Sequence, residues 1–264
     1  MHRHLNAERG KTANFAGLVF FRPTPRTVRN RLLRLLPPAE LERLLPRLEL
    51  IELSVKTVLL TAGAAVESVH FMETGTVSMI STLEDGTRIE VGLVGPEGMA
   101  GLPLLLGAPT SPLEGLVQVG GTALRLPAAG FRAALAELPS LLGLLLRYVD
   151  TFHVQVTQSA ACNSRHQIEQ RLARWVLMTH DRVDGDCFLM TQEFMSTMLD
   201  VQRPGVTLAI GALQRAGLVQ HDKGNVRMLD RPGLEAVACE CYETVRRRHD
   251  WLMAQPQSMP LAVR

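Results

Sequence analysis

The sequence TQEFMSTMLDVQRPGVTLAIGALQRAGLVQ occupies residues 191–220 and contains two short helical patterns separated by a brief turn. Thr191 is a typical helix N-cap, and Glu193 lies in the first turn, where a carboxylate interacts favourably with the helix dipole. The second pattern begins near Pro204, which suits a first helical position, and ends before Gly217, which can supply a left-handed cap. Two short helices joined in this way predict a helix-turn-helix.

The turn and the segment after the second helix complete this motif. Asp200 stands where such turns need left-handed backbone, a conformation that aspartate tolerates comparatively well. Residues 218–221 and 226–229 flank Asp222-Lys223-Gly224-Asn225, which predicts a tight hairpin. We therefore expect a winged helix-turn-helix that binds double-stranded DNA. Any helical hairpin followed by a β-hairpin is the alternative interpretation of the same pattern.

The outer face of the second helix carries the candidate DNA contacts. Arg203 has the donor groups for a guanine edge or a phosphate, and Thr207 can serve either contact. Leu208 shares this face. Gln202 and Lys223 are placed to contact the sugar-phosphate backbone of the duplex.

Residues 48–128 have the pattern of a β-rich domain. Short apolar runs are separated by turns at glycine or proline, which predicts strands. The runs occupy residues 58–60, 69–72, 77–80, 89–94, 116–119 and 123–126. Strands at this spacing predict a β-sandwich, barrel or jelly roll, with a hairpin turn at residues 83–86. Upstream, residues 27–45 have helical spacing that is interrupted at Pro37-Pro38.

A longer helical pattern begins at Pro139. Its apolar residues form a heptad seam made of Leu142, Leu145, Val149, Phe152 and Val156. Such a seam indicates a coiled-coil contact with a second chain or a helix buried in the chain's own core, and we favour the dimer. A second stripe starts at Ile168. One long helix should therefore change partner around residues 160–165, with Asn163-Ser164-Arg165 as the hinge about which the DNA-binding domains reorient.

Composition restricts the class of protein further. The chain has 264 residues, is 46% hydrophobic and carries a formal net charge of +2. A core can form without disulfides, and charge alone does not indicate nucleic acid. The sequence has neither an apolar stretch of about 20 residues, as a membrane helix needs, nor a signal-peptide core. We expect a cytoplasmic protein without membrane contact.

The cysteines and histidines predict neither a metal site nor catalysis. Cys162, Cys187, Cys239 and Cys241 have no CxxC or zinc-finger spacing, which favours reduced structural thiols, with Cys239 and Cys241 on a helix. No nucleophile elbow, P-loop or HExxH pattern accompanies the scattered histidines, and we do not expect an enzyme.

Taken together, these features resemble the cAMP receptor protein/FNR (Crp/Fnr) superfamily of bacterial transcription regulators over residues 28–252. The matching motifs are Gly95-Pro96-Glu97-Gly98, the helix from Pro139, Thr191-Gln192-Glu193, Val201-Gln202-Arg203 and Leu229-Asp230-Arg231-Pro232-Gly233-Leu234. The resemblance implies an α+β chain with a double-stranded β-helix (jelly-roll) sensor, a dimerisation helix and a winged helix on a palindromic operator. An activator would also contact RNA polymerase.

The implied organisation has four parts. A flexible extension covers residues 1–27, a cyclic-nucleotide-binding-like sensor domain covers 28–138, a dimerisation helix and hinge cover 139–180, and the DNA-binding domain covers 181–255.

The effector pocket departs from the family pattern. Cyclic-nucleotide-binding members hold ribose and phosphate with a glutamate and an arginine. Here Glu97 takes the glutamate's place, beside Gly98 and Met99, and Glu114 takes the arginine's. A cyclic phosphate buried without a cation is unfavourable. We therefore expect no response to cAMP, and either a less charged or apolar ligand or no effector.

Iron–sulfur and haem sensors, and a binding module without DNA contact, are the alternatives to an apolar-ligand or effector-free regulator. No cysteine precedes Cys162, so the N-terminal ligands of an FNR-type iron–sulfur cluster are missing. A haem sensor with His70 or His153 as axial ligand is an alternative. A β-roll binding module that acts on a protein partner is another, but it leaves the winged helix unexplained.

Overall fold

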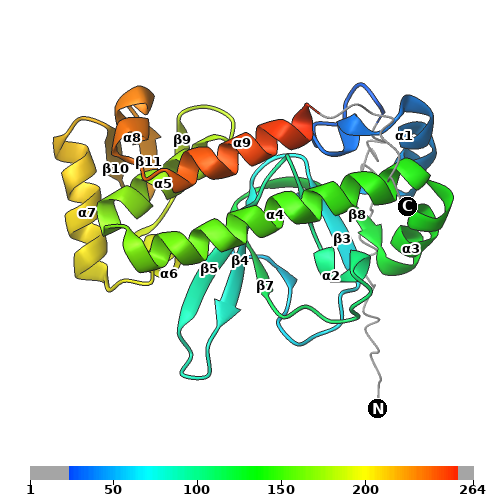
Figure 1. The fold of residues 1–264 in the computed structure, drawn as a ribbon, viewed down its shortest axis with the longest axis horizontal. Helices are drawn as coiled ribbons and strands as arrows, with labels where there is room; N and C mark the ends of the chain where they lie inside the picture. The colour runs from blue at the N-terminus through cyan, green and yellow to red at the C-terminus, as the bar shows by residue number, and fades with distance from the viewer. Residues whose placement is uncertain (1–23, 255–264) are drawn as a thin grey trace, which may run out of the picture.

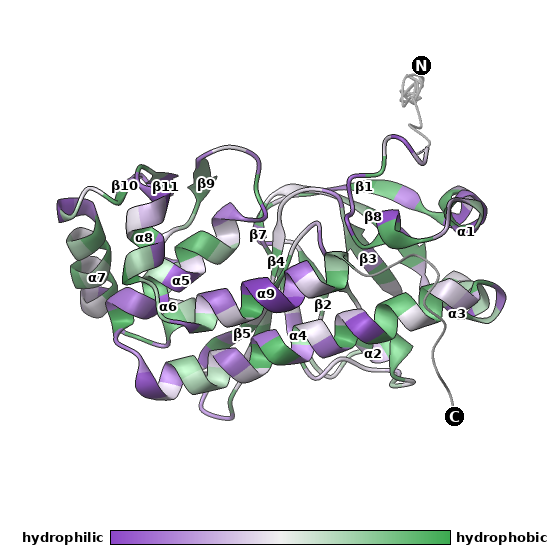
Figure 2. Cartoon of the chain, turned by 45° about the horizontal axis from the view of Figure 1, so that its top comes forward, coloured by the Kyte–Doolittle hydropathy of each residue, from purple (hydrophilic) through white to green (hydrophobic). Residues whose placement is uncertain are grey.

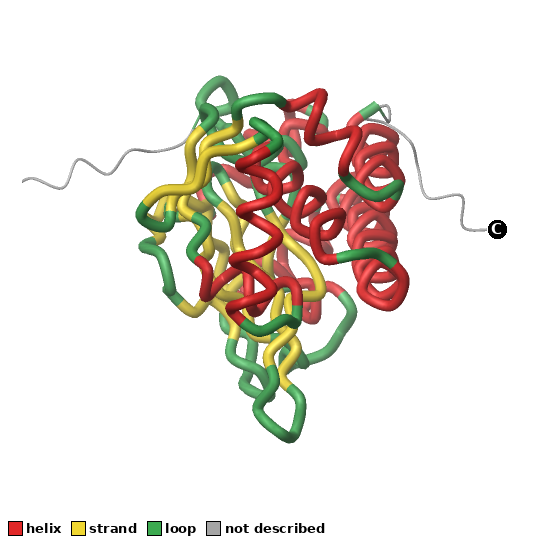
Figure 3. The backbone as a smooth tube through the Cα atoms, turned by 90° about the vertical axis from the view of Figure 1, so that its left-hand side faces the viewer, coloured by secondary structure: helices red, strands yellow, loops and turns green. Residues whose placement is uncertain are grey.

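A computed structural model of the chain describes residues 24–254, in which two domains are connected by the long helix α4 (Pro139–Arg165) (Figure 1). The predicted N-terminal extension lies outside the described residues up to position 23, and residues 24–27 include a turn. The N-terminal domain is built on β-sheets, and the C-terminal domain is mostly helical. In a view along the long axis, most strands lie on the left and most helices on the right (Figure 3).

Two four-stranded antiparallel sheets form the N-terminal domain. The first has the order β1-β8-β3-β6, with β1 (Glu49–Leu53), β8 (Gly121–Pro127), β3 (Ser68–Met72) and β6 (Met99–Ala100). The second has the order β2-β7-β4-β5, with β2 (Val58–Leu60), β7 (Glu114–Val119), β4 (Thr76–Thr82) and β5 (Arg88–Val94). The predicted jelly-roll fold is confirmed.

Short helices complete this domain. They are η1 (Leu33–Leu35), α1 (Pro38–Leu44), η2 (Leu45–Arg47), α2 (Leu102–Leu105) and α3 (Ala128–Glu137). All six predicted strand runs lie within observed strands. The sequence pattern missed β1, in which only Leu53 is buried, and β6, which has two residues.

The helix predicted before Pro37 is wrong. That segment is irregular apart from the single turn η1, because tertiary hydrogen bonds replace helical ones. The buried Asn30 side chain donates to the carbonyls of Met72 and Gly98 and accepts from the Leu33 N–H. The Glu73 carboxylate accepts from the N–H of Asn30 and of the preceding residue.

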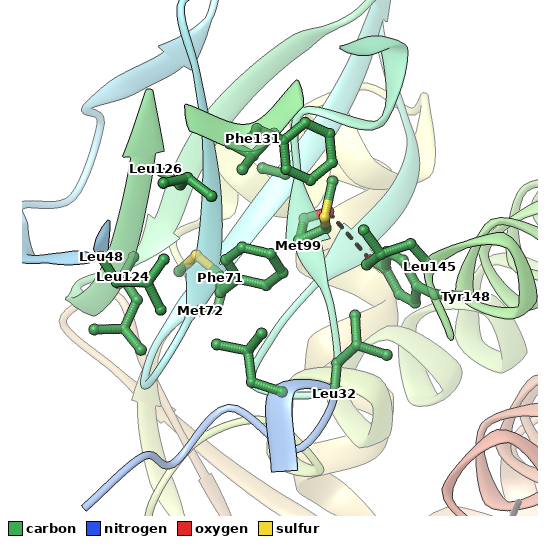
Figure 4. Close-up of a cluster of buried hydrophobic side chains, with 14 of the residues drawn as sticks. Leu32, Leu48, Phe71, Met72, Met99, Leu124, Leu126, Phe131, Leu145 and Tyr148 are labelled. Carbon is green, nitrogen blue, oxygen red and sulfur yellow. Dashed lines mark hydrogen bonds between the residues drawn. The ribbon is translucent and has the colours of Figure 1, made fainter. Parts of the chain in front are cut away.

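The core of the N-terminal domain includes side chains from α4 (Figure 4). Leu145 and Tyr148 enter it from the helix, and the Tyr148 hydroxyl donates to the Met99 carbonyl at 3.4 Å. A Cβ at Gly98 would lie 2.2 Å from the Tyr148 hydroxyl, so this close approach needs glycine. Helix α4 is therefore part of this domain's core as well as its connection to the next domain.

The C-terminal domain has a three-stranded sheet, in the order β10-β11-β9, and a helical core. Its elements are α5 (Ile168–His180), β9 (Cys187–Leu189), α6 (Gln192–Leu199), α7 (Arg203–Arg215), β10 (Val219–Asp222), β11 (Asn225–Met228) and α8 (Arg231–Val237). Trp175 of α5 packs in one core with Met198 of α6 and Ile210 of α7.

The prediction of one continuous helix through residues 160–165 and on to Ile168 is wrong. Helix α4 ends at Arg165, and His166 has extended backbone. Gln167 then caps α5 in a reciprocal box with Gln170, which satisfies backbone groups that a continuous helix would have paired.

The last described helix, α9 (Cys241–Met253), lies beside α4 and reaches both domains (Figure 2). Tyr242 and Val245 belong to the core of the C-terminal domain, whereas Leu252 is buried in the N-terminal core. The prediction that Cys239 shares a helix with Cys241 is wrong, because α8 ends at Val237 and α9 begins only at Cys241.

Within residues 24–254, no single helix is long and apolar enough to span a membrane. Helices α3 and α4, bent by 112° relative to each other, meet that criterion only as a pair.

Candidate nucleic-acid interface

Helices α6 and α7 form the predicted helix-turn-helix. The Thr191 hydroxyl caps α6 by accepting from the Phe194 N–H at 3.3 Å. Asp200 has φ 50°, the left-handed conformation predicted for the turn, and Gly217 has φ 74° after α7. The left-handed Asp200 reverses the chain between α6 and α7, and the left-handed Gly217 ends α7.

The outer face of α7 carries most of the predicted DNA contacts. Gln202, Arg203, Thr207 and Leu208 are all exposed, and Leu208 keeps 68% of its surface accessible. The opposite face is buried against α5 and α6 through Val206, Ile210 and Leu213. The Thr207 hydroxyl donates to the Arg203 carbonyl at 3.0 Å, so it remains available as an acceptor.

Strands β10 and β11 form the predicted wing. Lys223 and Gly224 have φ 47° and 80°, the signs of a type I′ hairpin turn, so the wing is tight and Lys223 lies exposed at its tip. Strand β9, which no pattern in the sequence indicated, pairs with β11 on its other side.

Two further exposed cations lie on the wing and on α7. Arg227 points away from the core because its strand neighbours Val226 and Met228 are buried, an alternation that the sequence itself shows. Arg215 lies in the last turn of α7. Neither they nor Arg203 and Lys223 form an ion pair with another residue of the described range. Four cations without an ion pair in residues 24–254, two on α7 and two on the wing, are suited to phosphate contact.

A buried ion pair joins the N-terminal domain to the region after α5. Arg182 Nε donates to Glu97 Oε1 at 2.7 Å, and both side chains are at most 4% exposed. Burial alone would raise the pKa of Glu97, but the charges of Arg182, His249 and Arg31 lower it to about 2. A Cβ at Gly95 would lie 2.6 Å from Arg182 Cγ, so glycine makes room for the arginine.

The structure does not bring the four residues of the predicted effector pocket together around one cavity. An apolar cavity of about 220 Å³ lies between the β-domain and α4, and Met99 lines it. Glu97 is committed to Arg182, Gly98 lies against Tyr148, and Glu114 forms an ion pair with Arg88 on the second sheet. Of the four predicted residues, only Met99 therefore faces this cavity.

Lining residues of the cavity are mostly apolar. They include Val94, Leu102, Val149, Phe152 and Val156, together with the exposed His153 of α4. No lysine or arginine of the described chain lines it. His70, the other histidine considered as a haem ligand, is buried on β3 away from the cavity lining, and burial lowers its pKa to about 4.

The predicted seam on α4 also needs correction. Leu145 is completely buried in its own chain, and the Phe152 ring packs over Gly92, where a Cβ would lie 2.9 Å away. Leu142, Val149 and Val156 are half-buried. The outward stripe therefore consists of these three residues with the half-buried Leu146 in place of Leu145 and the exposed His153 in place of Phe152. It keeps a heptad spacing.

A β-roll domain connected through a long helix to a winged helix-turn-helix defines a two-domain DNA-binding regulator. A model of the cyclic nucleotide-binding domain matches residues 50–137, and one of the Crp-like helix-turn-helix domain matches residues 170–237. Together they span more than half of the chain. The chain belongs to the Crp/Fnr superfamily of bacterial transcription regulators.

Solved structures share this fold at low sequence identity. A CRP-family transcriptional regulator from Thermus thermophilus is 20% identical with a TM-score of 0.61, and the match covers 71% of this chain and 96% of that one. FixK2 from Bradyrhizobium japonicum is 15% identical with a TM-score of 0.63, covering 73% and 98%. The global regulator CLP of Xanthomonas campestris is 14% identical with a TM-score of 0.57, covering 73% and 99%. No curated protein matches the sequence.

Proposed function

We propose that this DNA-binding regulator binds a palindromic operator as a homodimer and does not respond to cAMP. The main support for operator binding is the exposed face of α7, where Arg203 has no ion-pair partner among the described residues. An unpaired guanidinium at the start of a reading helix can donate two hydrogen bonds to a guanine edge.

The outward stripe on α4 supports the homodimer. Leu142, Leu146, Val149 and Val156 remain partly exposed at heptad spacing, and a second copy of the same helix would cover them. Pairing along α4 places two reading helices about a two-fold axis. Half-sites would then lie roughly 10 bp apart, one turn of the duplex. An activator would additionally contact RNA polymerase.

The apolar cavity supports the lack of a cAMP response. A cyclic phosphate carries a full negative charge, and burying it without a cation costs several kcal/mol. The lining offers Ser111 and His153 as its polar side chains, with no arginine or lysine. A volume of about 220 Å³ fits a small, apolar ligand better than a nucleotide, since ligand pockets usually exceed about 300 Å³.

Footprinting on the region upstream of the chain's own gene tests the proposal directly. We expect protection of an inverted repeat, with an affinity that falls steeply as salt increases because phosphate contacts release counterions. Calorimetry with cAMP and with cGMP should show no micromolar binding, and neither nucleotide should tighten operator binding. If no DNA is protected, the proposed operator binding is contradicted. If cAMP or cGMP binds and tightens the complex with DNA, the proposed lack of a cyclic-nucleotide response is contradicted.

A further inference from the structure

Four metal-ligand side chains meet where α4 ends and α9 begins. Cys162 lies in the last turn of α4 and His166 directly follows that helix, while Cys239 and Cys241 lie just before and at the start of α9. One ligand atom from each residue, three Sγ atoms and a ring nitrogen, lies within 4.8 Å of all the others. This cluster is separate from both the α7 surface and the apolar cavity.

Its spacing is close to that of a tetrahedral zinc site. Zinc bonds of about 2.3 Å to sulfur and 2.0–2.1 Å to nitrogen place tetrahedral ligands about 3.8 Å apart for two sulfurs and about 3.6 Å apart for sulfur and nitrogen. The Sγ atoms of Cys162 and Cys239 are 3.4 Å apart, and Cys241 Sγ lies 3.6 Å from His166 Nδ1. Small side-chain adjustments suffice to centre one ion.

The imidazole is held in the orientation that a ligand requires. His166 Nε2 lies 3.2 Å from Glu240 Oε2, while Nδ1 faces the thiol of Cys241. A carboxylate on the outer nitrogen of a metal-binding histidine is a common arrangement, because it fixes the ring and its tautomer. Glu240 is part of the same Cys239–Glu240–Cys241 segment, so one loop supplies two ligands and this support.

A buried cation, Arg174, lies close enough to the cluster for its charge to act on the thiols of Cys162 and Cys241. Arg174 of α5 is 0% exposed, and its Nη2 donates to Ser159 Oγ at 2.8 Å. Its Nε and Nη1 have no hydrogen-bond partner within residues 24–254. The Trp175 ring lies 5.1 Å from its guanidinium carbon, and the buried Glu90 interacts with its charge. Neutral thiols would add nothing to the balance of this buried charge. Three thiolates and a neutral imidazole around Zn²⁺ carry a net charge of −1, which compensates it.

We propose that Cys162, His166, Cys239 and Cys241 bind one Zn²⁺ ion, which joins the end of α4 to the start of α9. On binding, the three thiols release three protons to solvent, and the neutral imidazole coordinates through Nδ1. Soft sulfur ligands in a tetrahedral set select zinc over calcium or magnesium. With four protein ligands the site is closed, which is typical of a structural rather than a catalytic ion.

The position of the site gives the ion a mechanical role. The ligands come from the last turn of α4, from the break that follows it, and from the segment that leads from α8 into α9. Coordination would therefore fix the C-terminal domain relative to α4.

Metal analysis of the full-length protein tests the proposal. After growth with zinc and purification under reducing conditions, we expect one equivalent of zinc per chain. Cys162→Ser and Cys239→Ser should lose it, whereas Cys187→Ser should keep it, because Cys187 is exposed on β9 and outside the cluster. Glu240→Gln should bind zinc about 10–100-fold more weakly, as expected for a residue that supports a ligand.

Cobalt substitution of the wild-type chain provides a measurement that does not depend on how the variants fold. Titration of the zinc-free reduced protein with Co²⁺ should give the intense visible bands of tetrahedral thiolate coordination, and Zn²⁺ should abolish them. Absence of both zinc and the cobalt bands overturns the proposal. So does retention of zinc by the double variant Cys162→Ser/Cys239→Ser, or a Cys162–Cys239 disulfide in the freshly isolated protein in place of the metal.

Discussion

The buried pair of Glu97 and Arg182 gives the most direct test of how the two domains are held together. Arg182→Ala removes the buried cation and leaves Glu97, whose side chain is 3% exposed, with the longer ion pair to the half-exposed Arg31 at 3.5 Å. The substitution also removes the hydrogen bond from Arg182 Nη1 to the Met178 carbonyl at 2.7 Å. Breaking one side of a buried pair in this way costs about 3–5 kcal/mol.

The pKa of Glu97 gives an independent magnitude. The arginine and its neighbours lower this pKa from 4.5 to about 2, which corresponds to roughly 3 kcal/mol of stabilisation of the ionised form. Because the pKa is lower in the folded state, this contribution is fully present above about pH 4.5. It is lost as the pH falls toward 2. In Arg182→Ala the free energy of unfolding should therefore fall less steeply between about pH 4.5 and pH 2 than it does in the parent.

Urea denaturation at pH 7 and pH 3, followed by circular dichroism, measures both effects. Arg29→Ala is the matched control, because Arg29 pairs with Asp184 at 2.7 Å but both side chains are more than half exposed. That exposed pair should contribute only about 0–1 kcal/mol. If Arg182→Ala costs no more than Arg29→Ala, the buried pair does not stabilise the domain contact and the reasoning fails.

Three further predictions concern DNA, assembly and pH. Arg203→Ala should lose about 1–3 kcal/mol of operator discrimination in a mobility-shift titration at matched salt, whereas Arg132→Ala on the exposed face of α3 should bind as the parent does. Val149→Glu should dissociate the dimer in sedimentation experiments without unfolding the chain, and a wild type that is monomeric at micromolar concentration would contradict this prediction. Leu145→Ala should instead cost about 2–5 kcal/mol of stability, because Leu145 is fully buried. Burial raises the pKa of Glu90 to about 8, so its folded form resists ionisation and stability should fall as the pH rises from about 4.5 toward 8. Glu90→Gln should remove that decline in thermal melts, and an unchanged pH dependence would show that Glu90 is not the group responsible.

The local features of the DNA-binding region followed from the sequence. Thr191 as a cap, Asp200 in a left-handed turn and the Lys223-Gly224 hairpin are each decided by the intrinsic preferences of a few adjacent residues. The strands of the sensor domain were predictable for a similar reason, because their apolar runs are bounded by turn residues. The short strands β1 and β6 carry no such signal, since few of their residues alternate between core and solvent.

Tertiary structure decided which side of each element faces a partner. A heptad pattern shows that α4 has an apolar face, but a helix that contacts its own domain on one side and solvent on the other satisfies the same pattern. Only the packing shows that Leu145 is turned inward and Leu146 outward. In the same way, Glu97 stands within a family motif, and only the fold brings Arg182 to it from 85 residues away.

What the sequence determined by itself was therefore the kind of each local element and the family to which the order of those elements belongs. The assembly of Cys162, His166, Cys239 and Cys241 was decided by the tertiary structure alone, because 73 residues separate His166 from Cys239 and no local spacing links them. Helix, strand and turn preferences act over a few neighbouring residues, whereas ion pairs and ligand clusters depend on long-range packing. That is why the winged helix could be predicted and the cluster could not.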